Sequence, residues 1–210
     1  MAMSNIYFWE DYIKEVPIYK DLIKNYLQIK EEVINYLKLP DSLFDYPKYV
    51  GFFDKQLYDY YWKACPLSNF EGEVIADTSN ELEKVYMRQI VKNAKKHCPT
   101  INSIISELEN KSHLKNTFIS KLIPGSIINP HHGMTDNFLR VHLGLICDPE
   151  CKITVGEETK TWEEGKILAF KDGGPYYHSV EHKGTSERII LSMDIKLSYL
   201  SQYVDNINIC

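Results

Sequence analysis

The sequence predicts an α+β protein in which a helical N-terminal portion, residues 1–113, packs on a jelly-roll core of β-strands, residues 114–198. Apolar residues in the first half recur at three- and four-residue steps, the period of an amphipathic helix. In the second half, short segments rich in β-branched residues alternate with turn residues. A C-terminal tail is expected over residues 199–210. A chain of 210 residues buries a core without needing disulfides or a metal to fold.

Three segments of the N-terminal portion carry the helical pattern. The first runs from Pro17 to Lys38, and its proline suits the first turn of a helix. The others run from about Asn80 to Lys96 and from about Thr100 to Glu109. An aromatic-rich stretch, residues 46–70, lies between the first and the second, and the pattern assigns it no element. Aromatic side chains at this density are more often core residues than a ligand cage.

Eight strands are expected in the second half, each bounded by turn residues such as PGS, CDPE, EEGK and DGGP. Eight short strands in one run favour two packed sheets of the double-stranded β-helix, or cupin-like, kind. The expected strands are Leu114–Ile123, Ser126–His131, Phe138–Ile146, Cys151–Gly156, Glu158–Trp162, Lys166–Lys171, Tyr177–His182 and Arg188–Ile195.

Charge and cysteine usage limit the partners and the compartment. The formal net charge of -5 does not supply the concentrated basic surface that nucleic acids and anionic membranes attract. The five cysteines form an odd set without CxxC spacing, which favours free thiols in a reducing compartment. No apolar run suits a signal peptide or a membrane span. We therefore expect a cytoplasmic protein with neither a nucleic-acid nor a membrane partner.

Alternation within the strands predicts which side chains share a face. In Phe138–Ile146 the odd-numbered residues are apolar, whereas Arg140, His142 and Gly144 point to the other face. Arg188 begins another strand with the same alternation. Buried guanidinium groups need anionic partners, and a small dicarboxylate would supply them.

Histidines at strand ends are well placed to hold a metal at the mouth of a barrel. His131 and His132 follow Pro130, and His178 follows a Gly-Gly-Pro turn. A mononuclear non-haem Fe(II) site usually has two histidines and one carboxylate, the latter two residues after the first histidine. Gly133 occupies that position here.

Three runs of the second half together resemble the aspartyl/asparaginyl β-hydroxylase family of 2-oxoglutarate-dependent dioxygenases. The runs are SKLIPGSIINPHHGMTDNFLRVHLGL, CKITVGEETKTWEEGKILAFKD and HSVEHKGTSERIILSMDI. They contain a PG turn, His-x-Gly, Arg-x-His-Leu-Gly-Leu, Trp-x-x-Gly, and a second histidine ten residues before a second arginine. The resemblance spans about Leu114 to Ile195, and a glycine in place of the carboxylate ligand is also what this family shows.

The resemblance implies a site for Fe(II), 2-oxoglutarate as cosubstrate, and O2. His131 and His178 would be the catalytic iron ligands. Arg188 and Ser120 would bind the far carboxylate of 2-oxoglutarate, while Arg140 and His142 would lie around its metal-chelating end. Counting back from Arg140 selects His131 rather than His132 as the ligand. Trp162 is expected to serve core packing.

By the same resemblance, the reaction would hydroxylate the β-carbon of Asp or Asn residues in a peptide or protein, with release of succinate and CO2. Two alternatives stay open: a hydroxylase of a free amino acid such as proline, and a catalytically silent jelly-roll binding protein. The second rests on the segment FKDGGPYYH, which is two residues longer than the family's usual spacing and could move His178 away from His131. The extra length also leaves the role of Asp172 open.

Overall fold

The computed structural model describes residues 6–40, 42, 44–45, 62–68, 81–133, 135–174 and 176–205. Its helices are α1 (Pro17–Lys24), α2 (Tyr26–Leu37), α4 (Glu81–His97), α5 (Pro99–Asn110) and α6 (Leu197–Leu200). Its strands are β1 (Phe44–Asp45), β2 (Trp62–Pro66), β3 (Leu114–Leu122), β4 (Ile127–His131), β5 (Phe138–Ile146), β6 (Cys151–Val155), β7 (Glu158–Thr161), β8 (Ile167–Lys171), β9 (His178–His182) and β10 (Arg188–Lys196).

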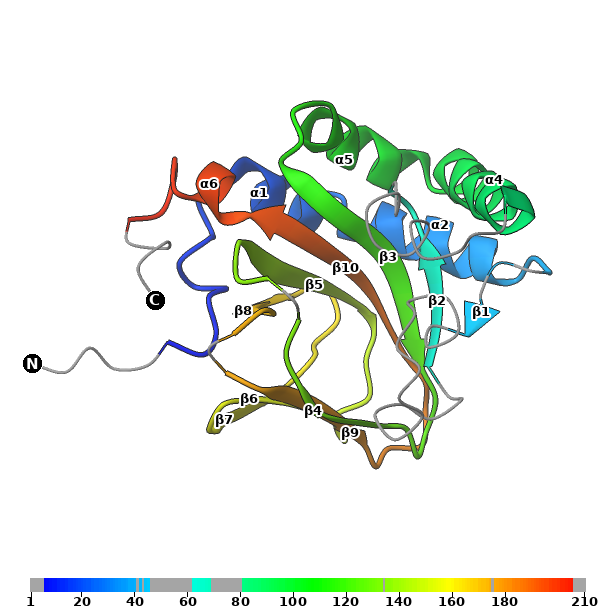
Figure 1. Cartoon of the computed structure of the whole chain (residues 1–210). Coiled ribbons are helices and arrows are strands. Elements are labelled where there is room, and N and C mark those ends of the chain that lie inside the picture. Colours follow the sequence, from blue (N-terminus) through cyan, green and yellow to red (C-terminus); the bar gives the residue numbers. More distant parts are fainter. Residues whose placement is uncertain are drawn as a thin grey trace, which may run out of the picture.

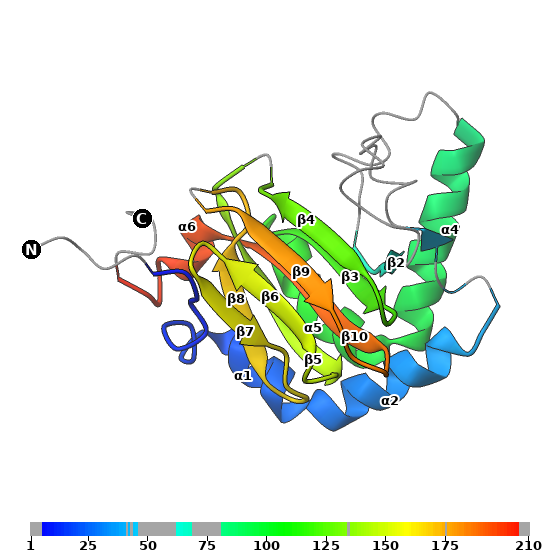
Figure 2. The ribbon, with the colours of Figure 1, turned by 90° about the horizontal axis from the view of Figure 1, so that it is seen from below.

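The strands form two facing antiparallel sheets, and the predicted jelly-roll fold is confirmed. The larger sheet has the order β1-β2-β3-β10-β5-β8, and the smaller one has the order β4-β9-β6-β7. The helices cover the outer face of the larger sheet, so the molecule has a helical layer and two sheet layers (Figures 1 and 2). All eight expected strands are present, with ends that differ from expectation by one residue at most.

Two differences from the sequence prediction lie in the N-terminal portion. The helix expected over residues 17–38 is interrupted at Asn25, whose side-chain amide donates to the Asp21 carbonyl at 2.8 Å. Asparagine competes with the helix for backbone partners in this way. In addition, β2 comes from the unassigned aromatic stretch and pairs with β3, so this portion extends the larger sheet. The rest of that stretch, apart from residues 62–68, lies outside the described residues.

Alternation separates two cores, as the sequence predicts. The odd-numbered residues of β5 and β10, such as Leu143 and Leu191, pack against helix residues that include Leu22, Ile29 and Ile105. The even-numbered residues face the smaller sheet, where Phe118 and Ile190 pack with Val180 and other side chains. The space between the sheets therefore receives every second residue of β3, β5 and β10.

The chain before α1 covers the free edge of β8. The Trp9 amide donates to the Ala169 carbonyl at 2.7 Å, and the Glu10 carboxylate accepts from the Ala169 amide at 3.3 Å. These contacts occupy the outward backbone groups of Ala169, so the middle of this edge is not open to pairing with another chain.

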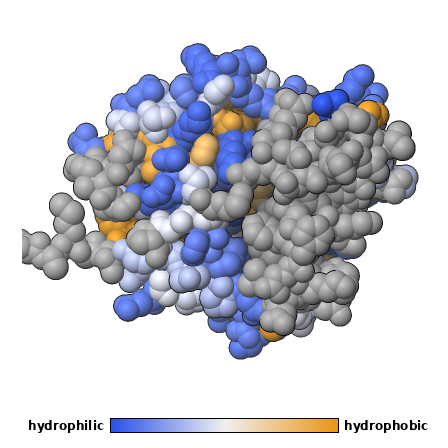
Figure 3. Space-filling model, viewed as in Figure 1, coloured by the Kyte–Doolittle hydropathy of each residue, from blue (hydrophilic) through white to orange (hydrophobic). Residues whose placement is uncertain are grey.

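Among the coloured residues on the face seen in Figure 3, hydrophilic side chains predominate and apolar residues form small separate patches. No helix among the described residues is long and apolar enough to cross a membrane. The four described cysteines, Cys65, Cys98, Cys147 and Cys151, are free thiols, as the sequence predicts; Cys210 lies outside the described residues.

Asp148 joins the β5–β6 turn to the β9–β10 turn that leads into Arg188. Its carboxylate accepts from the backbone amides of Glu150, Thr185 and Ser186 and from the Ser186 hydroxyl, each at 2.9 Å. These donors, the Ser186 amide foremost, hold the pKa of Asp148 well below its usual range. The ionised carboxylate therefore stabilises the folded state.

We predict that Asp148→Asn lowers the urea midpoint at pH 7. Because the folded-state pKa of Asp148 is depressed, its stabilisation is present above about pH 4 and is lost as the pH falls further. The deficit of the variant should therefore shrink below that pH. Urea unfolding of both proteins across pH would measure it. Glu150→Gln on the same turn should change little, because this carboxylate is exposed and its described ion pair is with exposed Lys152. A deficit that stays constant with pH would contradict the assignment.

Candidate active site

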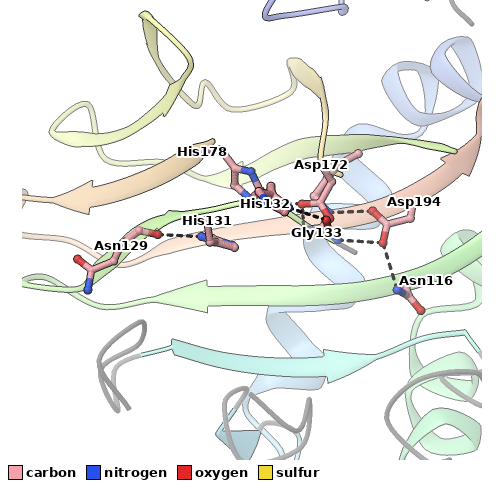
Figure 4. Close-up of polar contacts among 9 residues, drawn as sticks. Asn116, Asn129, His131, His132, Gly133, Asp172, His178 and Asp194 are labelled. Carbon is pink, nitrogen blue, oxygen red and sulfur yellow. Dashed lines mark hydrogen bonds and ion pairs between the residues drawn. The ribbon is translucent and has the colours of Figure 1, made fainter. Parts of the chain in front are cut away.

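Two of the predicted site residues, His131 and His178, lie side by side across the smaller sheet. His131 ends β4 and His178 begins β9, and the two residues are paired in the strand register. Their ring centroids are 4.2 Å apart (Figure 4). The two-residue extension before His178 has therefore not separated the histidines, and the observation that favoured a displaced His178 falls away.

Each of the two histidine rings is neutral and keeps one nitrogen with a lone pair, the form that binds a cation. The Nδ1 of His131 lies 2.8 Å from the Asn129 carbonyl oxygen. Since a carbonyl only accepts, Nδ1 carries the proton and Nε2 keeps its lone pair. Burial lowers the pKa of His131 and, more strongly, that of His178, so both rings are neutral at physiological pH. Within the described part of the chain, no group of three His, Cys, Asp or Glu side chains could hold a metal ion.

His132 has a different environment from this pair. Its ring packs on Tyr177 with centroids 5.1 Å apart, and its Nδ1 lies 3.0 Å from the Gly133 carbonyl oxygen. The His132 side chain is exposed, whereas the His178 side chain is buried. His131, rather than His132, is therefore the neighbour of His178, which agrees with the count back from Arg140.

Asp172 occupies the space that a side chain at position 133 would need. The Asp172 carbonyl accepts from the Gly133 amide at 2.7 Å, and a Cβ on Gly133 would collide with the Asp172 carboxylate. That carboxylate lies 3.3 Å from Nε2 of His178 and forms an ion pair with Nη1 of Arg140 (Figure 4). A carboxylate is therefore present beside the histidines, although it comes from the β8–β9 loop rather than from the His-x-Asp position.

Arg140 is held by carboxylates of the chain itself. Its Nε and Nη2 donate to the two oxygens of Asp194 at 2.8 and 2.9 Å, in addition to the contact with Asp172. The Asn116 amide donates to Asp194 from β3 at 3.1 Å. The sequence analysis did not predict that Asp194 pairs with Arg140. The signal that could have revealed this was the acidic residue on the inward face of β10.

Arg188 has a different environment from Arg140. Its side chain is buried, and its Nη2 donates to the Ser120 hydroxyl at 3.1 Å. Its Nε has no hydrogen-bond partner, and no carboxylate among the described residues pairs with it. Burial lowers the pKa of Arg188 to about 10, so the group remains charged at neutral pH. A buried, charged donor without a carboxylate is energetically costly unless a ligand supplies one.

The Ser120 hydroxyl has a proton left to donate to a ligand. It accepts from Arg188 and, at 2.9 Å, from Nε1 of Trp62 on β2. A hydroxyl has two lone pairs and one proton, so the Ser120 proton remains to be donated. The contribution of Trp62 was missed because nothing in the aromatic stretch marked one tryptophan as special.

His142 and Trp162 lie between the two arginines. Nε1 of Trp162 donates to Nδ1 of His142 at 3.1 Å, and the Trp162 ring lies 4.8 Å from the Arg188 guanidinium carbon. Burial, with smaller contributions from Arg140 and Arg188, holds the pKa of His142 well below its usual value.

One cavity joins all of the predicted site residues. It has a volume of about 40 Å³, several times the ~10–15 Å³ that one water requires. His131, His178, Arg140, His142, Ser120 and Arg188 all line it, together with Trp62 and Trp162. Its other walls are apolar side chains such as Phe118 and Ile153. The sequence predictions therefore converge on a single space between the two sheets.

One protein family matches most of the chain. The family described as aspartyl/asparaginyl β-hydroxylase matches residues 23–197, and thus extends beyond the second half into the helices. The chain belongs to the aspartyl/asparaginyl β-hydroxylase family.

Curated relatives match a shorter region. Human aspartyl/asparaginyl β-hydroxylase is 47% identical over 73 residues, which cover 34% of this chain and 9% of the human protein. Aspartate β-hydroxylase domain-containing protein 2 of Xenopus tropicalis is 35% identical over 112 residues, which cover 50% of this chain and 30% of that protein. The matched regions are thus less than a third of these two relatives' lengths.

Similarity to solved structures is low in sequence. A predicted oxalate decarboxylase from Thermotoga maritima is 19% identical, with a TM-score of 0.35 over 44% of this chain and 74% of that one.

The Gly133–Asp172 contact generates a prediction about stability. Gly133→Ala should lower the free energy of unfolding by about 1–3 kcal/mol, because the added methyl group overpacks a filled space. Removing the obstructing carboxylate with Asp172→Ala should reduce the cost of Gly133→Ala by about 1 kcal/mol. Urea denaturation of the two single variants and the double variant completes the cycle. Additive costs would show that the carboxylate does not fill the position.

Proposed function

We propose that this protein is an Fe(II)- and 2-oxoglutarate-dependent dioxygenase that uses O2 to hydroxylate the β-carbon of Asp or Asn residues in a peptide or protein, releasing succinate and CO2. The observation that carries the proposal is Arg188. Its buried guanidinium lacks a carboxylate partner among the described residues and lines the same cavity as the two histidines.

The donor set fits both absent groups. His131 and His178 offer neutral imidazoles at adjacent positions, which Fe(II) accepts as ligands. Arg188 and Ser120 offer an unpaired N–H and a free hydroxyl proton, which a carboxylate accepts. When bound, iron and 2-oxoglutarate supply with O2 the oxidising chemistry that inserts oxygen into a C–H bond.

The residues of the chain then bind, orient and exclude water. Arg188 and Ser120 hold the far carboxylate of the cosubstrate, and His142 and Arg140 lie toward its metal-chelating end. The Asp172 and Asp194 carboxylates keep Arg140 fixed in one orientation. The apolar walls lower the local dielectric constant, so these polar contacts are stronger than they would be in water.

The free thiols of the described cysteines support a cytoplasmic location.

The relatives' names support the proposed substrate. The human relative is named for hydroxylation of aspartyl and asparaginyl groups, which are residues of a polypeptide, and the Xenopus relative for hydroxylation of aspartate. A free amino-acid hydroxylase of the same fold is the alternative that an assay separates.

Anaerobic titration tests the site without knowledge of the substrate. Adding Fe(II) and 2-oxoglutarate to metal-free protein should produce the visible charge-transfer band of the iron–cosubstrate chelate. His131→Ala should abolish the band. Arg188→Ala should weaken 2-oxoglutarate binding by about 100-fold, because a charge-assisted contact in a buried site is lost.

Arg88→Ala is the matched control for Arg188→Ala, since Arg88 is exposed on α4. It should bind both groups as the parent does. No band in the parent protein would contradict the dioxygenase proposal and favour the silent binding protein.

Substrate class is tested by mass spectrometry. With Fe(II), 2-oxoglutarate and O2, Asp- or Asn-containing peptides should gain one oxygen atom at that residue, with an equal amount of succinate formed. Peptides with Ala at the same position should remain unmodified. Hydroxylation of free proline but of no peptide would instead establish the amino-acid hydroxylase.

A further inference from the structure

Trp162 makes two polar contacts in addition to its packing in the core. It follows β7 in the Trp-x-x-Gly turn, and only 3% of its surface is exposed. Its N–H group donates to His142, and its ring face lies against the guanidinium of Arg188. A single side chain from the β7–β8 connection thus contacts β5 and β10 inside the barrel.

The hydrogen bond fixes the proton on His142. An indole N–H only donates, so Nδ1 of His142 must accept at 3.1 Å. The low pKa of His142 keeps the ring neutral, and a neutral imidazole that accepts at Nδ1 carries its proton on Nε2. Phe170 packs edge-on against the same ring with centroids 5.4 Å apart, which limits its rotation. His142 therefore presents an N–H donor where it lines the cavity.

The ring contact orients Arg188. With the guanidinium carbon 4.8 Å from the centre of the Trp162 ring, the indole lies against one side of the guanidinium and limits how it can turn. The N–H groups point outward in the guanidinium plane, one of them to Ser120. The edge that includes the unpartnered Nε is therefore left for a ligand.

We propose that Trp162 is a positioning residue that sets both ends of the cosubstrate site, by holding His142 as an Nε2–H donor and Arg188 in the plane that receives the far carboxylate. The inference deepens the proposed function and rests on it. Trp162 has this role because it contacts both His142 and Arg188.

Trp9 offers a matched comparison. It is also buried, but its Nε1 has no hydrogen-bond partner among the described residues. Trp9→Phe and Trp162→Phe therefore remove the same atoms from a buried ring. They differ in whether a hydrogen bond to His142 is lost.

The first measurement does not involve metal or cosubstrate. Nitrogen NMR of histidine-labelled, metal-free protein should show His142 as the neutral Nε2–H form, with Nδ1 at the position of a hydrogen-bonded acceptor. In Trp162→Phe this signal should move to that of a free acceptor or exchange with an Nδ1–H form, while Trp9→Phe leaves it unchanged. An Nδ1–H form in the parent, or no change in Trp162→Phe, would overturn the inference.

The second measurement is anaerobic 2-oxoglutarate titration of the Fe(II) protein. Trp162→Phe should weaken 2-oxoglutarate binding by about tenfold, through loss of one hydrogen bond to a group that contacts the cosubstrate. Trp162→Ala should weaken it further, since the ring over Arg188 is lost too. Fe(II) affinity should stay at the parental value in Trp162→Phe, as should cosubstrate affinity in Trp9→Phe.

The two measurements separate the possible failures. If the parent protein binds no 2-oxoglutarate, the proposed function is wrong, whatever the NMR signal of His142 shows. If the parent binds it and Trp162→Phe binds it equally well, the proposed function stands and the positioning role of Trp162 is wrong.

Discussion

The interior of the barrel is organised around a positive charge that the described chain does not neutralise. Burying a guanidinium is costly without a partner, and Arg188 receives only a serine hydroxyl and an indole face. These neighbours come from separate elements: Ser120 from β3 and Trp162 from the β7–β8 connection, with Trp62 of β2 behind Ser120. The charge of Arg188 and the remaining Ser120 proton make this end of the cavity suit an anion.

The two arginines on the inward faces show how the same residue type serves different ends. Arg140 has two carboxylates of the chain as partners, so its charge is already compensated and its geometry is fixed. Arg188 is left uncompensated. One half of the cavity is therefore a closed ionic network beside the histidines, and the other half is an open set of donors. If the proposed dicarboxylate binds here, this asymmetry would give it a defined direction in the barrel.

Most of the barrel strands could be predicted because the signals that mark a strand lie within its own segment of the sequence. Each strand is bounded by turn residues, and the two-residue period reveals which side chains share a face, so His142, Arg188 and His178 could be assigned to the interior. The break at Asn25 could not be predicted, since the apolar spacing continues through it. Nor could β2, because its residues lack clear alternation. The roles of Trp62, Asp172 and Trp162 depend on contacts between segments far apart in the sequence, which a single sequence does not reveal.

The packing of Gly133 against Asp172 has an evolutionary consequence. A lineage with this arrangement cannot acquire a carboxylate at position 133 by one substitution, because the new side chain would meet a like charge in an already filled space. Loss of Asp172 first would deprive Arg140 of one partner and leave His178 without its neighbouring carboxylate. Both single steps are disfavoured, so the two positions are expected to change together or not at all. Packing alone would thus keep position 133 free of a carboxylate beside the histidine pair, independently of any advantage to the proposed reaction.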